Sequence, residues 1–384
     1  SGFIVVSLSP SGGERWVYRC NGTSGEDEAR WIAVAPDDNL YAAGTVHGSG
    51  TESDFTVVSL TPLGAERWVY VYDGPVNLYD YAEAIAMGRD GNVYAAGTSH
   101  AGTGHSFDFM VISLTPKGEE RWIYRYNGSG NGMDAAFAIV TGTDGNIYAA
   151  GYSSESGTPY CFTVISLTPS GQERWVYTRD GSGYSWDCAH SLAVGGDGNV
   201  YATGVIDDSV TVNDIIVVSL TPSGEERWVY RYDGSDNAYD WDVGYSIVAG
   251  IDGNLYAAGY SCGAETYEDF TVIGLSPDVG VEEKLEAGSK MPECRLRLSA
   301  SPVPTAGRVT IHFYVPAVAG IGLSVYDACG RLVTTLVKCT EQVTPRAVVW
   351  DGRNDSGDEV STGIYYCRLT AGDLVATKKM VVLR

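Results

Sequence analysis

The sequence predicts an all-β fold with a β-propeller over residues 1–281, a linker over residues 282–293 and a separate small domain over residues 294–384. Two observations carry this prediction. Gly is abundant (48 residues) and charged residues make up only 19% of the chain, which suits many short strands joined by tight turns. Tryptophans spaced by 52, 54, 53 and 53 residues mark a repeat of propeller-blade length: Trp16, Trp68, Trp122, Trp175 and Trp228.

Each repeat reads as four strands, called A to D in chain order. Strand A is a short apolar segment such as residues 84–87, and strand B is residues 93–97. The Asp-Gly-Asn between them favours a hairpin turn, because Gly adopts positive φ at low cost. Strand C is represented by residues 55–60 and strand D by residues 66–70. The Thr-Pro-x-Gly between them predicts a turn, where Pro ends a strand without interrupting it.

The size of the side chains indicates how the repeats are arranged around an axis. Strand B carries Ala-Ala-Gly at residues 95–97, and such small residues allow neighbouring sheets to approach closely near the axis. Strand D carries Trp68 and Tyr70, which alternate with Val69 and therefore point to one face of the strand. We expect these aromatic side chains to fill the space where blades diverge.

The number of strands leaves one strand in excess. A ring that joins the last A–B pair to the first C–D pair has five blades, although six blades also remain open. One C strand, residues 3–8 or residues 270–275, then has no place in the ring. An unpaired apolar strand either pairs elsewhere in its own chain or adds to the sheet of a neighbouring subunit. Repeated head-to-tail addition of this kind produces a filament.

Several phrases of the repeat carry a family resemblance. Asp80-Tyr-Ala-Glu-Ala-Ile-Ala86, Gly91-Asn-Val-Tyr-Ala-Ala-Gly97 and Asp108-Phe109 recur in related form through roughly residues 1–277. They resemble the SBBP-type β-propeller repeats of secreted bacterial proteins. The resemblance implies a propeller in an extracellular setting and no particular activity.

The C-terminal residues show a second resemblance. The matching residues are Val325-Tyr-Asp327, Gly330-Arg-Leu-Val333, Trp350-Asp-Gly352, Gly363-Ile-Tyr-Tyr366 and Lys379-Met380. They resemble the Ig-like domain of FlgD-like modules and of type IX secretion (por) sorting domains. This implies a small Ig-like β-sandwich, export across an outer membrane, and attachment to the cell surface or release. Whether the domain is retained or removed after export stays open.

The cysteines suggest disulfides and an oxidising compartment. The even count of eight in a chain rich in strands and turns favours disulfides, and the absence of any C-x-x-C pair argues against zinc and redox motifs. The alternative is that the cysteines are isolated buried thiols. We expect Cys161 to pair with Cys188, which lie at connections on the same face of successive blades, and Cys20 to pair with Cys262 if the ring closes. The tail contributes Cys294, Cys329, Cys339 and Cys367, whose connectivity stays open.

The net charge of −23 is distributed unevenly. Residues 294–384 carry 11 basic and 7 acidic residues (+4), so residues 1–293 carry 14 and 41 (−27). A strongly negative field repels nucleic acid and anionic membranes. No run of ~18 apolar residues indicates a transmembrane helix. The opposite signs favour self-association, in which the tail of one subunit meets the body of another.

The acidic D–A loops offer a candidate calcium site. They carry the pairs Asp73/Asp80 and Asp180/Asp187, and their counterparts in the other repeats. Clustered carboxylates suit Ca²⁺. The alternative is that each Asp accepts hydrogen bonds from the backbone of its own turn, and repetition in every blade favours this alternative.

No residue pattern predicts catalysis, since the five histidines are scattered without a nucleophile or orienting partner. We therefore expect a non-enzymatic, secreted or cell-surface structural or adhesive protein, with a filament subunit assembled head to tail by strand exchange as one form of it. The alternative is an extracellular propeller that binds or cleaves carbohydrate, with surface glycans as partners. Tyr184, Trp186, Tyr239 and Trp241 in the D–A loops are the candidates for stacking on sugars, and loop packing is their other interpretation.

Overall fold

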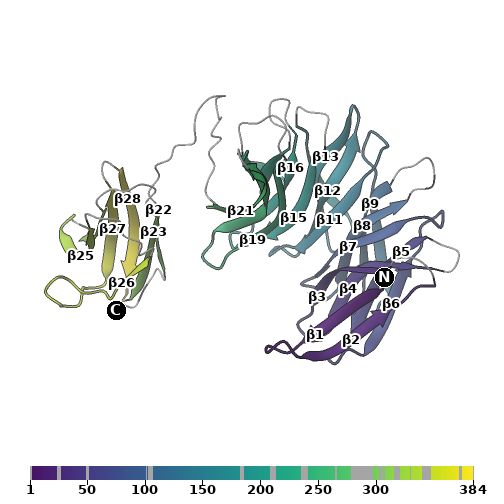
Figure 1. Cartoon of the computed structure of the whole chain (residues 1–384), viewed down its shortest axis with the longest axis horizontal. Coiled ribbons are helices and arrows are strands. Elements are labelled where there is room, and N and C mark those ends of the chain that lie inside the picture. The colour runs from purple at the N-terminus through teal and green to yellow at the C-terminus, as the bar shows by residue number, and fades with distance from the viewer. Residues whose placement is uncertain are drawn as a thin grey trace. The chain divides into compact units, whose positions relative to one another are not determined.

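A computed structural model gives the fold of the chain (Figure 1). It describes residues 2–23, 27–48, 52–100, 102, 107–181, 186–207, 213–234, 241–263, 266–277, 297–301, 305, 308–314, 321–328, 330–339, 347–371 and 374–383. The chain divides into two compact units, Ser1–Glu282 and Glu283–Arg384. Most of the predicted linker and Cys294 lie outside the described residues. No helix long and apolar enough to cross a membrane occurs in the described part of the chain.

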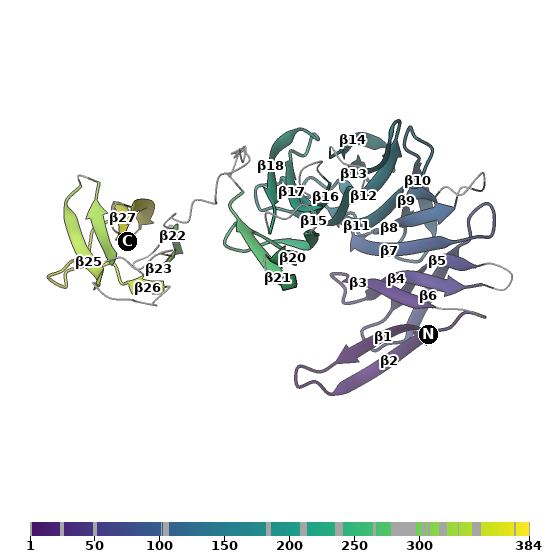
Figure 2. The ribbon, with the colours of Figure 1, turned by 45° about the horizontal axis from the view of Figure 1, so that its top comes forward.

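The first unit consists of antiparallel sheets that follow one another in chain order (Figures 1 and 2). Four of them have four strands each, and neighbouring strands in each sheet are consecutive in sequence. They are blade 1, β3 (Glu28–Val34), β4 (Leu40–His47), β5 (Ser53–Leu60) and β6 (Glu66–Tyr72); blade 2, β7 (Asp80–Met87), β8 (Val93–His100), β9 (Phe107–Leu114) and β10 (Glu120–Tyr126); blade 3, β11 (Ala135–Thr141), β12 (Ile147–Glu155), β13 (Thr158–Leu167) and β14 (Glu173–Arg179); and blade 4, β15 (Cys188–Val194), β16 (Val200–Ile206), β17 (Asp214–Leu220) and β18 (Glu226–Tyr232).

Shorter sheets stand at the two ends of this array. The N-terminal sheet pairs β1 (Phe3–Leu8) with β2 (Glu14–Cys20), and the C-terminal sheet joins β19 (Val243–Ala249), β20 (Leu255–Gly263) and β21 (Thr266–Leu275). The first strands of successive blades contact one another, as the inner strands of a propeller do. The sheets are thus repeated four-stranded units of the kind that form propeller blades, and the four predicted strands of the repeat are confirmed.

Side-chain hydrogen bonds explain why the Asp-Gly-Asn turns recur. Asp90 Oδ2 accepts hydrogen bonds from Asn92 Nδ2 and from the Tyr94 hydroxyl, each at 2.7 Å. The Tyr94 ring is buried, so its hydroxyl needs such an acceptor. One Asp therefore closes the hairpin and also satisfies the polar end of a core tyrosine.

The small residues of strand B allow the first two strands of a blade to meet closely. A Cβ atom added at Gly97 would lie 1.8 Å from the Tyr81 carbonyl oxygen of β7. No side chain is tolerated at that distance. This close contact lies within one sheet, between β7 and β8, and the predicted role of Ala-Ala-Gly in the approach of neighbouring sheets stays a prediction.

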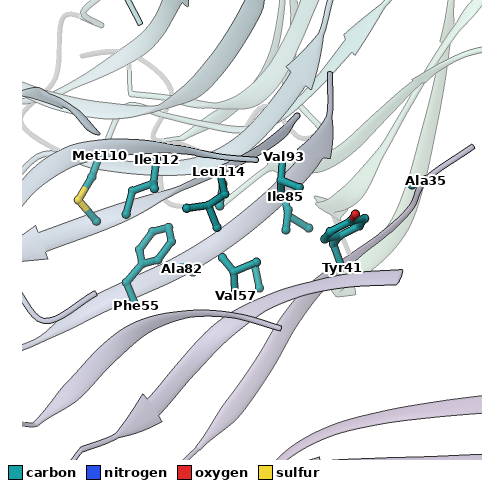
Figure 3. Close-up of a cluster of buried hydrophobic side chains, with 12 residues drawn as sticks. Ala35, Tyr41, Phe55, Val57, Ala82, Ile85, Val93, Met110, Ile112 and Leu114 are labelled. Atoms are coloured by element: carbon teal, nitrogen blue, oxygen red, sulfur yellow. The ribbon is translucent and has the colours of Figure 1, made fainter. Parts of the chain in front are cut away.

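The core lies between successive blades. Tyr41, Phe55 and Val57 of blade 1 pack against Ile85 and Ile112 of blade 2 in one cluster (Figure 3). The equivalent cluster between blades 3 and 4 contains Tyr148, Phe162 and Val164. Each blade therefore has one face buried by the blade before it and the other face buried by the blade after it.

The second unit contains two antiparallel sheets. One sheet is β22 (Arg297–Ser301), β23 (Val309–Tyr314) and β26 (Ala347–Trp350). The other is β24 (Ile321–Asp327), β25 (Leu332–Cys339), β27 (Gly363–Ala371) and β28 (Leu374–Val382). Side chains of both sheets share one apolar core, including Ile311, Trp350 and Leu369. This arrangement is a two-sheet sandwich, and its assignment to the Ig-like sorting class stays a prediction.

The four cysteines of the first unit form no disulfide in the structure. Cys20, Cys161 and Cys188 carry free thiols, and the Cys262 thiol donates to the Trp241 carbonyl oxygen. Cys188 lies in an apolar cluster with Ala135, Tyr152, Val205 and Val243. Whether Cys161 pairs with Cys188, and Cys20 with Cys262, stays a prediction.

Among the four cysteines of the tail, only Cys367 has a side chain that the structure describes. Cys367 is buried in the sandwich core and carries a free thiol, whose pKa burial raises to about 12. Cys294, Cys329 and the side chain of Cys339 lie outside what the structure describes.

Candidate functional site at the ends of the blade array

The repeated phrase Thr-Pro-x-Gly-x-Glu-Arg-Trp-x-Tyr forms the contact that links each blade to the next. Trp68 Nε1 of blade 1 donates to the Pro116 carbonyl of blade 2 at 3.0 Å, and the Tyr70 hydroxyl donates to Glu120 Oε2 at 2.7 Å. The Trp68 ring covers Gly118, whose φ is 85° and whose added Cβ would lie 2.7 Å from Trp68 Cδ2. Only Gly fits this seat. We call this set the tryptophan–turn contact.

The tryptophan half of this contact repeats at each junction. The indole donates to a proline carbonyl at 3.0–3.1 Å in the pairs Trp16–Pro62, Trp122–Pro169, Trp175–Pro222 and Trp228–Pro277. The last pair differs in sequence. After Pro277, Val279 replaces the seat glycine and Val281 replaces the glutamate. The C-terminal turn therefore matches the motif only at its proline.

The N-terminal turn, in contrast, matches the motif at its proline, glycine and glutamate. Pro10, Gly12 and Glu14 match the proline, glycine and glutamate of the motif. Gly12 has φ 83°, like the other seat glycines, but an added Cβ there would have no atom within 4 Å. The array thus presents a complete acceptor turn with an open seat at one end and an incomplete turn at the other.

Apolar residues that are buried inside the array are exposed at its ends. On the C-terminal sheet, Phe270 is 85% exposed, whereas Phe109 and Phe162 at the same repeat position are 0% exposed. On the N-terminal sheet, Val6 is 51% exposed, whereas its counterpart Val58 in β5 is 0% exposed. Exposed apolar side chains that cluster on one face indicate a contact surface.

A third exposed group lies on β3, which follows the N-terminal sheet. Trp31, Ile32 and Val34 are exposed, while Ala84 and Ile85 at the equivalent positions of blade 2 are buried. The N-terminal sheet lacks the A and B strands that would cover them. All three groups are thus exposed at or next to an end of the array.

The strands β1 and β21 hold equivalent positions in the repeat. Their sequences, Phe-Ile-Val-Val-Ser-Leu and Phe-Thr-Val-Ile-Gly-Leu, match in apolar pattern. β1 pairs with β2 in a register that sets Phe3 opposite Cys20, and β21 pairs with β20 in a register that sets Phe270 opposite Tyr260. In the five-bladed ring expected from the sequence, β1 would pair with β20.

That ring closure is absent from the described residues. β20 pairs with β21, its immediate successor in the chain, and β1 pairs only with β2. Joining two strands across a short connection costs less loop-closure entropy than joining the two ends of the unit. The excess strand is therefore placed beside β20, and β1–β2 remain an incomplete sheet.

The structure describes two of the four aromatic residues predicted to bind sugars, Trp186 and Trp241. Trp186 is 50% exposed and stacks on Tyr160 with ring centroids 4.5 Å apart and an interplanar angle of 19°. Trp241 is exposed beside Cys262 of the next sheet. Tyr184 and Tyr239 lie outside the described residues. Trp186 thus shows partial loop packing together with an accessible surface.

The aspartates that begin strand A bind their own loops. Asp187, for example, accepts the backbone N–H of Gly181 at 2.5 Å and that of Asp207 at 2.6 Å. Burial raises the pKa of Asp187 to about 7 and that of Asp134 to about 6. These loops agree with the local-turn interpretation, with one exception near Asp80 that is described below.

Comparison with known proteins adds limited information. No family model and no curated protein sequence matches the chain. Among solved structures, PorZ, a surface component of the type IX secretion system of Porphyromonas gingivalis, is 12% identical with a TM-score of 0.37. The match covers 97% of this chain and 48% of PorZ, so the chain spans about half of that protein.

Two further structures match at similar levels. The propeller domain of the Trilobed protease from Pyrococcus furiosus is 8% identical over 94% of this chain and 97% of its own length, with a TM-score of 0.37. A periplasmic gluconolactonase from Pseudomonas aeruginosa is 14% identical over 90% and 96%, with a TM-score of 0.36. The fold assignment rests on the sheets of the chain itself.

Proposed function

We propose that the protein is a non-enzymatic structural protein of the cell surface or extracellular medium, and that its copies assemble head to tail by strand exchange. In this assembly β1 and β2 of one copy join β19 and β20 of its neighbour and complete a fifth blade. β1 takes the position beside β20 that β21 holds in the single chain. Because the same exchange is available at the other end of each copy, the assembly is open and produces a filament.

The open tryptophan–turn contact at Gly12 is the observation that carries this proposal. In the completed blade, the N-terminal turn replaces the turn at Pro277 as the partner of Trp228. The neighbour's Pro10 then accepts the indole, Gly12 supplies the seat and Glu14 lies where the motif places its tyrosine acceptor. The N-terminal turn has all three motif residues, whereas the C-terminal turn has only one.

Burial of apolar surface supports the same arrangement. The neighbour's β19 and β20 would cover Ile32 and Val34 of β3, and β1 would bury Val6 against blade 4, where Ile273 of β21 now lies. A buried Val or Ile side chain stabilises by about 1.5–3 kcal/mol relative to an exposed one. One exchange therefore buries side chains at both ends of the array.

The resemblance of the tail to sorting domains supports a location outside the outer membrane. The tail is basic and the blade array strongly acidic, at +4 and −27 by sequence count. Attraction between such opposite charges speeds the encounter of two copies, and added salt weakens this attraction. The tail is proposed as the export signal and as a second element of self-association.

The assembly is tested by measuring mass against concentration, with electron microscopy of the same samples. We expect masses that grow with concentration for the intact chain. Gly12→Asn keeps the left-handed backbone that Asn tolerates but places a Cβ in the tryptophan seat, so it should abolish growth. Gly91→Asn is the matched control, because Gly91 has φ 78° and no atom within 4 Å of an added Cβ.

The alternative outcomes are distinguishable. A strictly monomeric intact chain at all concentrations would contradict the filament. If such a monomer loses stability in Gly12→Asn but not in Gly91→Asn, the exchange occurs within one chain as a closed five-bladed ring.

A carbohydrate-binding function is the second candidate, because Trp186 presents an aromatic face to solvent. The Tyr160 ring stacked on it holds the indole in place, as sugar-stacking platforms require. A glycan array on the intact chain and on Trp186→Ala tests it. Binding that disappears in Trp186→Ala would support this function, and no binding by the intact chain would exclude it.

A further inference from the structure

Three aspartates meet between blades 1 and 2. Asp54 lies in β5, Asp73 follows β6, and Asp80 begins β7. One carboxylate oxygen from each lies within 4.8 Å of the others. Asp54 and Asp80 are buried, whereas Asp73 is exposed, so the cluster opens to solvent on the Asp73 side.

Asp80 differs from its counterparts in the way its carboxylate is bound. In the other four loops, the backbone N–H twenty residues further along donates to the Asp Oδ1 atom, at 2.6–2.9 Å, in the pairs His47–Asp27, Ser154–Asp134, Asp207–Asp187 and Cys262–Asp242. The equivalent N–H of His100 donates to the Tyr79 carbonyl oxygen at 3.1 Å.

The consequence is an orphaned oxygen in a buried side chain. Asp80 is 0% exposed; its Oδ2 accepts the Gly74 N–H at 2.7 Å, and its Oδ1 has no hydrogen-bond partner. Burial raises the pKa of Asp80. The nearby Ser99 side chain and the Gly74 N–H offset part of this effect, and the Arg125 guanidinium and the His100 N–H contribute less. A buried carboxylate oxygen without a donor is costly unless a ligand satisfies it.

The charged residues around this cluster also differ from those at the equivalent positions of blades 2 and 4. Residue 71 pairs with Thr56 in β5, and the residues at the same register in blades 2 and 4 are Arg125 and Arg231. Arg231 contacts Asp214 at 2.7 Å and Arg125 approaches Asp108 at 3.6 Å. In blade 1 this position is Val71, so β6 contributes no arginine beside Asp54, and the positive charge that acts on Asp80 is that of Arg125 in blade 2.

Each of the other loops lacks at least one of these features. Blade 4 has a second trio, Asp214, Asp233 and Asp242, but Arg231 pairs with Asp214 and both Asp242 oxygens accept backbone N–H groups. The loop after blade 2 has Asn127 at the middle position. The cluster of Asp54, Asp73 and Asp80 thus combines three features. It has three carboxylates, it has no arginine at the position of Val71, and one of its oxygens has no hydrogen-bond donor.

We propose that Asp54, Asp73 and Asp80 bind one divalent cation, with Ca²⁺ as the ion that best matches the donors. The three side chains offer only oxygen ligands, which Ca²⁺ prefers, and the exposed Asp73 side leaves room for the water ligands that complete six to eight positions. The ion would join β5 and the loop after β6 to β7, so it would tie blade 1 to blade 2.

The test is a titration of the intact chain with CaCl2 after removal of metal by EDTA. We expect a calorimetric stoichiometry of one ion per chain and a rise in the melting temperature. Asp73→Asn, at an exposed position, should weaken binding by about tenfold or more, because it removes one charged ligand. Val71→Arg, on the exposed face of β6, introduces the arginine that blades 2 and 4 carry at this position and should abolish binding.

The matched control is Asp233→Asn in the blade 4 trio, which should leave Ca²⁺ binding unchanged. The inference is overturned if the intact chain shows neither heat nor a melting shift. It is also overturned if Asp73→Asn and Val71→Arg bind Ca²⁺ like the intact chain, or if Asp233→Asn removes the binding. A parallel titration with MgCl2 that gave the stronger response would overturn the assignment to Ca²⁺.

Discussion

Residues at equivalent positions of the repeat have different surroundings in the interior of the blade array and at its two ends. Phe109 in β9 is fully buried by the next blade, and Phe270, at the same position of the repeat in β21, is 85% exposed. The Trp68 ring covers Gly118, whereas a Cβ added at Gly12 would have no atom within 4 Å. In a repeat protein the sequence of one unit determines its strands, but its neighbours determine which side chains are buried.

The largest expected effect separates an interior phenylalanine from an end phenylalanine. Phe109→Ala should lower the free energy of unfolding by about 3–5 kcal/mol, because it empties a closed inter-blade core. Phe270→Ala should change it by less than about 0.5 kcal/mol in dilute protein, because the side chain is exposed. Urea unfolding below the assembly concentration measures both. Equal losses would show that β21 is covered in solution.

The next effect compares a filled seat with an open one. Gly118→Asn should cost about 1–3 kcal/mol, because the new Cβ meets the Trp68 ring. Gly12→Asn should cost much less in the dilute monomer. Both glycines have φ near 85°, at 85° and 83°, so backbone strain cancels in the comparison. The melting temperatures of the two variants measure this difference. Similar losses of stability in both variants would mean that the Gly12 seat is occupied.

A smaller effect tests the tyrosine of the tryptophan–turn contact. Tyr124→Phe removes the hydrogen bond of 2.6 Å from the Tyr124 hydroxyl to Glu173 between blades 2 and 3. We expect a loss of about 0.5–1 kcal/mol, since this contact is partly solvated. Tyr245→Phe, on an exposed end residue, serves as the control with no expected loss. A loss for Tyr245→Phe as large as that for Tyr124→Phe would remove the distinction between interior and end.

The smallest effect is a dependence on pH that arises at an interior junction. Burial holds the pKa of Asp187 at about 7, above the ordinary value of 3.8. The folded chain thus binds this proton more tightly than the unfolded chain, and the associated stability is present below pH about 4 and lost as pH rises to about 7. The melting temperature should be higher at pH 5 than at pH 8.

Two variants isolate the source of this dependence. Asp187→Asn should flatten the pH profile of the melting temperature. Asp252→Asn should not flatten it, because the Tyr256 hydroxyl holds the pKa of Asp252 below its ordinary value. A melting temperature of Asp187→Asn that still falls from pH 5 to pH 8 as steeply as that of the intact chain would show that Asp187 is solvated.

Much of the fold was predictable because its determinants are local and repeated. The Asp-Gly-Asn turns, the Ala-Ala-Gly strands and the tryptophan spacing each specify structure within about 53 residues, and the four strands of each blade were predicted from them. The excess strand was also predicted from counting. The pairing of the cysteines depends on how two blades pack, which local sequence does not specify.

The sequence by itself determined the strands, their turns and the number of half-blades, since hydrogen-bonding pattern and turn chemistry act between near neighbours in the chain. The tertiary structure alone decided that β20 pairs with β21, that the Gly12 seat is open, and that Asp54, Asp73 and Asp80 lie close together, with one Asp80 oxygen that has no hydrogen-bond donor. The reason is physical. Competition between equivalent strands, and the loss of one backbone donor at His100, depend on distances between segments that no local pattern contains.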